Sequence, residues 1–419
     1  MISPSSSAMN SLDRFLSRLE RTRDDAQRSG LREAVILHHD EADGLTSAAL
    51  AKLAMERMGM TTRLICLDKL YPEVIADVEK GPRRIVVCAD LGSAHIGRLT
   101  QYNDRAQNML VILDHHDTLE SNDPMVYNLN PELDGFSGEL DASAATVAYF
   151  FAKFVDPRLS KFAHLAIVGA DEIPDEPRGL NMIVVRDALE QGLVKVSRND
   201  YKIQVQGLEY ARTRLSTILN VLGSVGYYRK GPEIGVDTCI KGLSEETIEL
   251  AKKLEEERKE ANKRMLAIIS EKGLRKEKML QWFHAEDNYS GMSGKVVGSF
   301  CSYLSYQRQV EQTKYLVGMM NVSSEVPGWG KLSSSLVKAS GRAPKPVADM
   351  INKGKRPPLS RILSQACLTA GGFGDGHSVA ASGVFPRGKE SLFISEMDRM
   401  ASAGLVSSSS KSKGGQTKL

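Results

Sequence analysis

Residues 109–117 read MLVILDHHD, so five apolar residues are followed directly by Asp114, His115 and His116. An unbroken apolar run of this length is typical of a strand that is buried on both faces, as in a parallel sheet. Residues that follow such a strand lie at the carboxyl edge of the sheet, where open α/β folds bind their ligands. This stretch therefore predicts both the fold class and the location of a functional site.

Three further apolar runs precede it, and they alternate with stretches that fit helices. The predicted strands are Ala34–His38, Arg63–Cys66, Arg84–Ala89 and Met109–Leu113, and the predicted helices between them include Thr46–Met58 and Pro72–Glu79. Strands that alternate with helices favour a mostly parallel sheet. We therefore expect an α/β fold.

Ionisable residues follow three of these runs. The first run leads into His39-Asp40-Glu41-Ala42-Asp43-Gly44, the third into Asp90 and the fourth into Asp114-His115-His116. A fourth site, Asp171, follows the apolar segment Ile167–Ala170. One acid after a strand is explained by a turn or a helix cap. Four such sites at one sheet edge, two of them with histidine, favour a centre for Mg²⁺ or Mn²⁺, because these ions prefer carboxylate oxygens and Mn²⁺ also accepts imidazole. Two such ions roughly 4 Å apart can drive displacement at phosphorus, with a shared Asp keeping their spacing.

The composition is that of an ordinary globular protein, with 419 residues, 42% apolar and 26% charged residues, and a formal net charge of +3. The five cysteines are far apart in the sequence, which argues against a zinc ribbon or a disulfide framework and fits a reducing compartment. No apolar run resembles a signal peptide or a membrane span. We therefore expect a cytoplasmic protein without a membrane partner.

The remaining chain divides into segments of different character. Residues 11–27 show helical apolar spacing, residues 140–220 look largely helical, and residues 244–272 form a charged helix that is either solvated or a coiled-coil partner. A second globular unit begins near Lys278. The predicted segments are a flexible lead with a helix (1–29), a catalytic α/β domain (30–190), a helical connector (191–284), a smaller α/β substrate-binding domain (285–398) and a disordered tail (399–419).

Two features of the second unit suggest contact with phosphate. The glycine-rich stretch 371–376 is followed by His377, and its flexible backbone would let N–H groups approach an anion, although a plain turn explains it equally well. Basic residues recur at Lys331, Lys338, Arg342, Lys345, Lys353, Lys355, Arg356 and Arg361. They fit either a solvated face or a nucleic-acid backbone track. The aromatic residues Trp282, Phe283, Trp329 and Phe373 are either core residues or base-stacking platforms.

The motifs at residues 39–44, 90, 114–116 and 171, in this order, resemble those of the DHH phosphoesterase superfamily. Residues 371–381, GGFGDGHSVAA, are similar to the glycine-rich GGH motif of the DHH-associated domain. With Ser340-Gly341-Arg342 upstream, the chain is similar to the archaeal RecJ-like branch of nucleases, and the resemblance spans most of residues 30–390.

The resemblance implies particular roles for these residues. It implies two Mn²⁺ or Mg²⁺ ions, one held by His39, Glu41 and Asp90, and one held by Asp43, Asp90, His115 and Asp171. It implies that His116 faces the scissile phosphate and that Asp114 supports the site from behind. It also implies that the substrate is held by Arg342, Gly374, Gly376 and His377.

The sequence departs from the family pattern at three positions. Glu41 stands where the family usually has Asp, and an alternative register would use Asp40 as the ligand instead. In the second unit, Asp375 and Ser382 stand where glycine is common, and a carboxylate beside a phosphate site would repel it.

The function that the resemblance implies is a two-metal exonuclease acting on single-stranded DNA or RNA in replication or repair. The basic stretch and the extra material at 195–285 favour long strands. One alternative is a phosphodiesterase for oligoribonucleotides or cyclic dinucleotides. Another is a replisome scaffold with weak or no catalysis, bound to the GINS complex beside the replicative helicase. GINS is also a plausible partner of an active enzyme.

Overall fold

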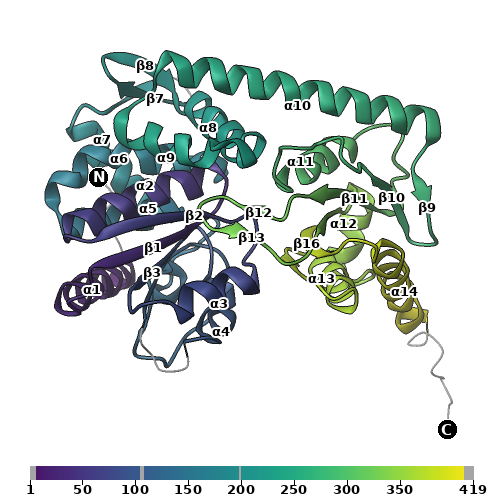
Figure 1. Cartoon of the computed structure of the whole chain (residues 1–419), viewed down its shortest axis with the longest axis horizontal. Helices are drawn as coiled ribbons and strands as arrows, with labels where there is room; N and C mark the ends of the chain where they lie inside the picture. The colour runs from purple at the N-terminus through teal and green to yellow at the C-terminus, as the bar shows by residue number, and fades with distance from the viewer. Residues whose placement is uncertain (1–5, 104–107, 198–199, 410–419) are drawn as a thin grey trace, which may run out of the picture. The chain divides into compact units, whose positions relative to one another are not determined.

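The computed structural model describes residues 6–103, 108–197 and 200–409 (Figure 1). The chain divides into two compact units. The first consists of Met1–Leu254 together with Val326–Gly330, and the second consists of Glu255–Glu325 together with Lys331–Leu419. The boundary falls within the long helix α10 (Glu245–Lys272).

The first unit is built on a five-stranded parallel sheet in the order β2-β1-β3-β4-β5. Its strands are β1 (Glu33–His38), β2 (Thr61–Cys66), β3 (Ile85–Ala89), β4 (Met109–Leu113) and β5 (Val126–Asn128). Every residue of β3 and β4 is buried, as their unbroken apolar sequences require. The predicted α/β fold class and its four strands are confirmed, and β5 is an additional strand.

The strand register brings the candidate site residues to one edge. His38, the last residue of β1, pairs with Ala89 of β3, and Ala89 pairs with Leu113 of β4. The next residue after each strand therefore emerges at the same line across the sheet. In addition, the strand order reverses at β1, because β2 lies on one side of it and β3 on the other. The carboxyl ends of β1 and β3 thus flank the switch point at which α/β sheets form their crevice.

Helices cover both faces of this sheet. Right-handed crossovers on either side of β1 place α2 (Ala42–Arg57) on one face and α3 (Pro72–Lys80) and α4 (Ile96–Thr100) on the other (Figure 1). Helix α2 is buried almost all round, because α5 (Ala144–Val155), α6 (Ala163–Gly169) and α9 (Gly231–Lys241) pack against it in addition to the sheet. Its small residues allow this close packing.

The predicted helical region 140–220 and connector 191–284 need a correction. Three short antiparallel strands, β6 (Val194–Ser197), β7 (Asp200–Val205) and β8 (Leu208–Ala211), lie between α7 (Gly179–Glu190) and α8 (Arg212–Asn220). The hairpin between β7 and β8 turns on Gln206 and Gly207, both with positive φ, as a two-residue type I′ turn requires. In β7, buried Tyr201 and Ile203 flank exposed Lys202, a period of two that marks a strand.

Residues 326–330 of the first unit cover part of the edge strand β2. The N–H of Cys66 donates to the Pro327 carbonyl at 3.0 Å, and the Arg63 guanidinium donates to the Gly328 carbonyl. The Trp329 indole N–H donates to Asp77 at 2.8 Å. Because an open strand edge invites pairing with other chains, this cover protects the sheet.

The second unit contains a six-stranded mixed sheet in the order β15-β16-β14-β11-β10-β9. Its strands are β9 (Arg275–Lys276), β10 (Leu280–His284), β11 (Tyr315–Val322), β14 (Leu336–Arg342), β15 (Phe373–Gly376) and β16 (Ala380–Pro386). The pair β12 (Glu325–Val326) and β13 (Gly330–Lys331) forms a separate two-stranded ribbon. The helices are α11 (Lys295–Leu304), α12 (Lys345–Asn352), α13 (Leu359–Thr369) and α14 (Glu390–Ser409).

The chain ends differ in part from the expected flexible segments. Helix α1 (Ser6–Arg28) begins earlier than predicted, and α14 continues to Ser409, so residues 399–409 of the expected disordered tail are helical. The remainder of the predicted lead and tail, residues 1–5 and 410–419, lies outside the described residues. Within the described part of the chain, the structure has no helix with the length and hydropathy of a membrane span.

Phe15 ties α1 to the core of the first unit and gives the first testable prediction. Its side chain is fully buried, and its ring meets Phe150 of α5 edge-on at a centroid distance of 5.8 Å. Phe15→Ala should lower the free energy of unfolding by about 3 kcal/mol, because it leaves a cavity in the core. Denaturant unfolding followed by circular dichroism measures this change. The exposed Glu20→Ala on the same helix is the control, and an equal effect of the two variants would contradict the prediction.

Candidate metal centre

The loop His39–Asp43 joins β1 to α2 and is held by contacts from both sides. The N–H of Ala42, in the first turn of α2, donates to the side-chain oxygen of Asn220 at 2.7 Å. Gly44 allows the loop to fold tightly, because a Cβ at this position would lie 2.5 Å from the His39 carbonyl oxygen. The loop is therefore fixed before any ligand binds.

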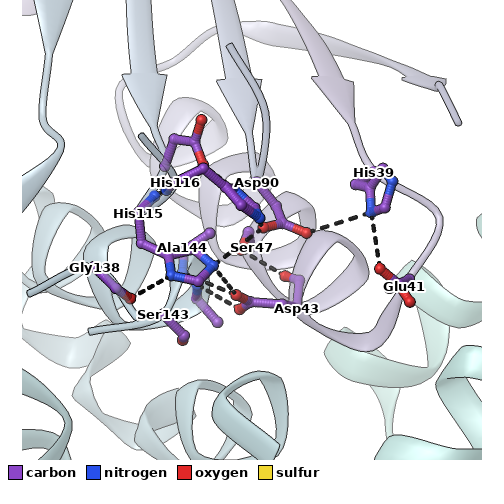
Figure 2. Close-up of polar contacts among 12 residues, drawn as sticks. His39, Glu41, Asp43, Ser47, Asp90, His115, His116, Gly138, Ser143 and Ala144 are labelled. Carbon is purple, nitrogen blue, oxygen red and sulfur yellow. Dashed lines mark hydrogen bonds and ion pairs between the residues drawn. The ribbon is translucent and has the colours of Figure 1, made fainter. Parts of the chain in front are cut away.

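Asp90 occupies the centre of the site (Figure 2). Its Oδ2 lies 3.6 Å from Nδ1 of His39, and its Oδ1 lies 3.8 Å from Nε2 of His115. Asp90 is buried, and its Oδ1 has no hydrogen-bond partner among the residues that the structure describes. The residue has a φ of +63°, a left-handed conformation that costs free energy in a non-glycine residue and that turns the carboxylate between the two histidines.

His39, Glu41 and Asp90 form one group of possible ligands. Nδ1 of His39 lies 3.4 Å from a carboxylate oxygen of Glu41, and Figure 2 shows both contacts of this nitrogen. The structure thus brings together the three residues that the family resemblance assigned to the first ion. Asp40, the alternative ligand, is instead fully buried.

His115 is oriented by a backbone carbonyl. Its Nδ1 donates to the carbonyl of Gly138 at 2.7 Å, so the lone pair of Nε2 faces Asp43 at 3.5 Å and Asp90. Burial, together with the neighbouring His116, lowers the pKa of His115, which favours the neutral form of the ring. A side chain at position 138 is impossible without rearrangement, because its Cβ would lie 1.7 Å from the His115 carbonyl oxygen.

Asp43 is held at the N-terminus of α5. Its two carboxylate oxygens accept the N–H groups of Ala144 at 2.9 Å and Ala145 at 2.8 Å. Burial and the nearby charge of Asp90 nevertheless raise the pKa of Asp43 well above its usual value. Two carboxylates that oppose each other's ionisation in a buried site are the arrangement that a bound cation relieves.

Asp114 and His116 form a hydrogen-bonded ion pair. Asp114 is buried and accepts Nδ1–H of His116 at 2.7 Å and the N–H of Ser93 at 2.9 Å. Burial opposes ionisation of both side chains, but their mutual attraction is stronger. It holds the pKa of Asp114 below its usual range and raises the pKa of His116 to about 10. His116 is half exposed, so it presents a positive charge to solvent at neutral pH.

The donor set fits hard divalent cations. Nitrogen and oxygen atoms of Asp90, His115 and His116 all lie within 4.8 Å of one another, and His39, Glu41 and Asp43 add donors on either side. Carboxylates with a few imidazoles suit Mn²⁺ and Mg²⁺. The buried Oδ1 of Asp90 finds no hydrogen-bond partner in the described part of the chain, which is a further mark of a site that is built for a cation.

Residues 33–170 match the family model described as the DHH family, N-terminal domain. This part of the first unit is similar to that domain. A search of curated proteins finds no match to this chain.

Solved structures of RecJ share the fold of the chain. RecJ from Thermus thermophilus, in complex with Mn²⁺, has 16% identity and a TM-score of 0.60 over 93% of this chain and 55% of that one. The chain thus spans about half the length of that protein. A second structure, exonuclease RecJ bound to manganese, has 16% identity and a TM-score of 0.59 over 93% of this chain and 94% of that one.

CDC45 from Entamoeba histolytica also has this fold. It has 8% identity and a TM-score of 0.54 over 93% of this chain and 98% of that one. At identities this low, the likeness to RecJ and to CDC45 shows the fold alone.

Asp171, another predicted ligand, contacts an arginine. The carboxylate of Asp171 is 3.0 Å from Nε of Arg212, which also contacts Asp200 at 3.3 Å. Arg212 is the first residue of α8 and directly follows β8. The assignment of Asp171 as a metal ligand stays a prediction.

In the second unit, the predicted substrate residues meet at one end of the sheet. Arg342 of β14 pairs in register with Ala380 of β16, and Gly376 of β15 pairs with Ala381. His377 follows Gly376 directly and is exposed. Arg342 and His377 therefore flank the start of β16.

Two other predicted substrate residues, Gly374 and Gly376, are needed for strand pairing in the second unit. Gly376 has a φ of +138°, and a Cβ there would lie 2.5 Å from Cα of Ala381, so strand pairing requires a glycine. A Cβ at Gly374 would lie 3.0 Å from the Ser382 carbonyl oxygen. Asp375 pairs in register with Ser382, which joins the two departures from the family pattern in one strand pair.

Three residues that support the centre were not predicted from the sequence. Gly138 and Ser93 act through backbone atoms, and Asn130 donates to the His116 carbonyl at 2.6 Å. Such contacts leave no pattern of chemical groups in the sequence. Gly138 could have been noticed only as a glycine in a turn, and many turns contain one.

Gly138→Ala should weaken metal binding by about 10- to 100-fold, because the new methyl group displaces the backbone that orients His115. Isothermal titration with Mn²⁺ measures the affinity. Gly97→Ala is a matched control, since the space around Gly97 is open and it lies in helix α4. Equal affinities of the two variants would contradict the role of the Gly138 carbonyl.

Proposed function

We propose that the protein is a metal-dependent exonuclease that hydrolyses phosphodiester bonds in single-stranded DNA or RNA. The observation that carries this proposal is the placement of Asp90, whose two carboxylate oxygens face two separate ligand groups. That arrangement fits a pair of ions that share one carboxylate. The RecJ-like fold supports the choice of nucleic acid as substrate.

The two ligand groups divide the donors between the ions. His39, Glu41 and Asp90 would hold one cation, and Asp43, Asp90 and His115 would hold the other. When bound, such ions supply charge neutralisation at phosphorus and activation of a water molecule. Asp171 is left out of this assignment because Arg212 pairs with it.

His116 would act on the substrate. Its ring is half exposed and is held through Nδ1 by Asp114, so the remaining edge is available to a phosphate oxygen. A cationic donor at this position stabilises the negative charge that builds up on the phosphate during hydrolysis. Asp114 keeps the ring charged and in a fixed orientation.

The second unit would hold the nucleic-acid backbone. Lys331, Lys345, Lys353, Lys355 and Arg361 are exposed, whereas Lys338 of the predicted basic track is buried. Phosphate groups bind such exposed cations with a strong dependence on salt. Of the aromatic residues considered as stacking platforms, Phe283 is buried in the core and contacts Phe300 edge-on.

The proposal is tested by a time course on end-labelled DNA and RNA strands of several lengths with Mn²⁺. Stepwise release of mononucleotides from long strands is the expected result. Cleavage confined to the shortest oligomers or to cyclic dinucleotides would contradict the exonuclease and favour a phosphodiesterase for small substrates. No cleavage with any divalent metal would favour the replisome scaffold instead. A binding assay with the GINS complex would then test that role.

His116→Gln should lower kcat by about 10²- to 10³-fold, because one charged donor to the transition state is lost. Its affinity for Mn²⁺ should stay within about threefold of the wild type, since His116 lies outside both ligand groups. Single-turnover cleavage and Mn²⁺ titration measure the two quantities. His284→Gln in the second unit is the control histidine, and an unchanged kcat in His116→Gln would contradict the role of this residue.

The double substitution Lys353→Ala and Lys355→Ala should raise KM for long strands and reduce the salt dependence of binding by about two released ions. Fluorescence anisotropy at several salt concentrations measures the slope. Lys259→Ala with Lys263→Ala is the matched control, because these exposed lysines of α10 are already close to glutamates. A slope that changes equally in both pairs would contradict a backbone track at residues 353–355.

A further inference from the structure

Arg342, the last residue of β14, is a half-buried arginine that forms no ion pair with a carboxylate within the described part of the chain. Partly buried cations in proteins are usually paired, because removing an unpaired charge from water costs free energy. Two other half-buried arginines follow this rule, since Arg258 pairs with Glu255 and Arg212 with Asp171. The charge of Arg342 is therefore available to an anion from outside the chain.

Two neutral oxygen atoms hold the guanidinium of Arg342 in place. Its Nε–H donates to Oγ of Ser302 in α11 at 2.8 Å, and an N–H of Nη1 donates to the Gly341 carbonyl at 2.8 Å. Because neither acceptor is charged, the two contacts orient the guanidinium without neutralising it. Nη2 makes no hydrogen bond among the described residues, so its N–H groups remain for a phosphate oxygen.

The hydroxyl of Ser302 is itself fixed by the backbone of α11. It donates to the carbonyl of Gly298, one turn earlier in the helix, at 3.2 Å. A hydroxyl has one hydrogen, so once that hydrogen is engaged Oγ has only lone pairs to offer a second group. Helix α11 packs against β11 and β14 (Figure 1), and the acceptor for Nε–H therefore has a defined position.

Gly298 leaves the space that the guanidinium needs. A Cβ at this position would lie 3.2 Å from Nη2 of Arg342 and 2.9 Å from Oγ of Ser340. Gly298 lies inside α11, where alanine favours a helix more than glycine does, so helix stability does not account for it. Residues four apart lie on the same face of a helix, so Gly298 and Ser302 form one surface for Arg342.

We propose that Ser302 is a positioning residue for Arg342, and that Ser302 and Gly298 form a seat on α11 that holds the guanidinium ready for a phosphate of the nucleic-acid backbone. This inference rests on the proposed exonuclease and names a binding element for its substrate in the second unit. A planar guanidinium suits this task because it can bind two phosphate oxygens at once. Fixing it in advance reduces the entropy that is lost when the strand binds.

The first test measures the affinity of the full-length protein for a fluorescently labelled single-stranded DNA by anisotropy, with a chelator present so that no strand is cut. Arg342→Ala should raise Kd by about 10- to 100-fold, because charge-assisted hydrogen bonds to phosphate are lost. Ser302→Ala should raise Kd by about three- to tenfold, because the guanidinium keeps its charge but loses its fixed orientation. Ser395→Ala in α14 is the matched control, since this serine also donates to a carbonyl of its own helix. An unchanged Kd in Ser302→Ala would overturn the proposal.

A double-mutant cycle distinguishes positioning from a general effect on the fold. In the Arg342→Ala background, Ser302→Ala should change Kd by less than about twofold, since no guanidinium is left to orient. An equal loss of affinity in both backgrounds would refute the proposal, because Ser302 would then act independently of Arg342.

Gly298→Ala tests the seat without removing a hydrogen-bonding group. The new methyl group meets two side-chain atoms that can move, so the helix should form as in the wild type, which circular dichroism checks. Its Kd should rise by about three- to tenfold, as in Ser302→Ala. If Ser302→Ala does not fold, Gly298→Ala decides the matter, and a Kd equal to that of the wild type overturns the proposal.

The two proposals fail separately. Cleavage of long strands by the wild type, together with an unchanged Kd in Arg342→Ala and Ser302→Ala, overturns this inference alone. Wild-type protein that binds the strand through Arg342 and Ser302, but cleaves none with Mn²⁺, overturns the proposed exonuclease alone.

Discussion

The site depends on the register of three parallel strands. Because β1, β3 and β4 end at the same line of the sheet, His39, Asp90 and Asp114 leave it side by side although about 75 residues separate the first from the last. The reversal of strand order at β1 opens the crevice between them. The left-handed backbone of Asp90 then directs one carboxylate to both sides of that crevice, so a local strain of the chain serves the geometry of the whole site.

A backbone carbonyl and a carboxylate then give adjacent histidines different chemistry. His115 donates to the Gly138 carbonyl and is neutral because burial lowers its pKa, whereas His116 bonds to Asp114 and is cationic. One ring is thereby prepared to bind a cation and the other to meet an anion. Helix α5 adds to this arrangement, because its N-terminal N–H groups hold Asp43 close to His115.

Much of this could be predicted from the sequence, for a definable reason. Buried parallel strands are unbroken apolar runs, and a ligand that directly follows such a run must lie at the sheet edge, so β1 to β4 and the residues after them were found. The strands β6 to β8 were missed because their apolar alternation is short and polar residues interrupt it. The role of Asp171 stays a prediction, and its contact with Arg212, 41 residues away in the sequence, was not foreseen. Gly138 and Asn220 act across 23 and 178 residues, and no local pattern reports such contacts.

The central claim is that Asp90 joins two cation sites at the switch point of the sheet. Electron paramagnetic resonance during titration with Mn²⁺ tests it most directly, because two Mn²⁺ ions that share a carboxylate are spin-coupled. The account predicts two bound ions per chain with a coupled signal that disappears in Asp90→Ala. A single uncoupled Mn²⁺ in the wild type, or a coupled pair that survives in Asp90→Ala, would contradict it.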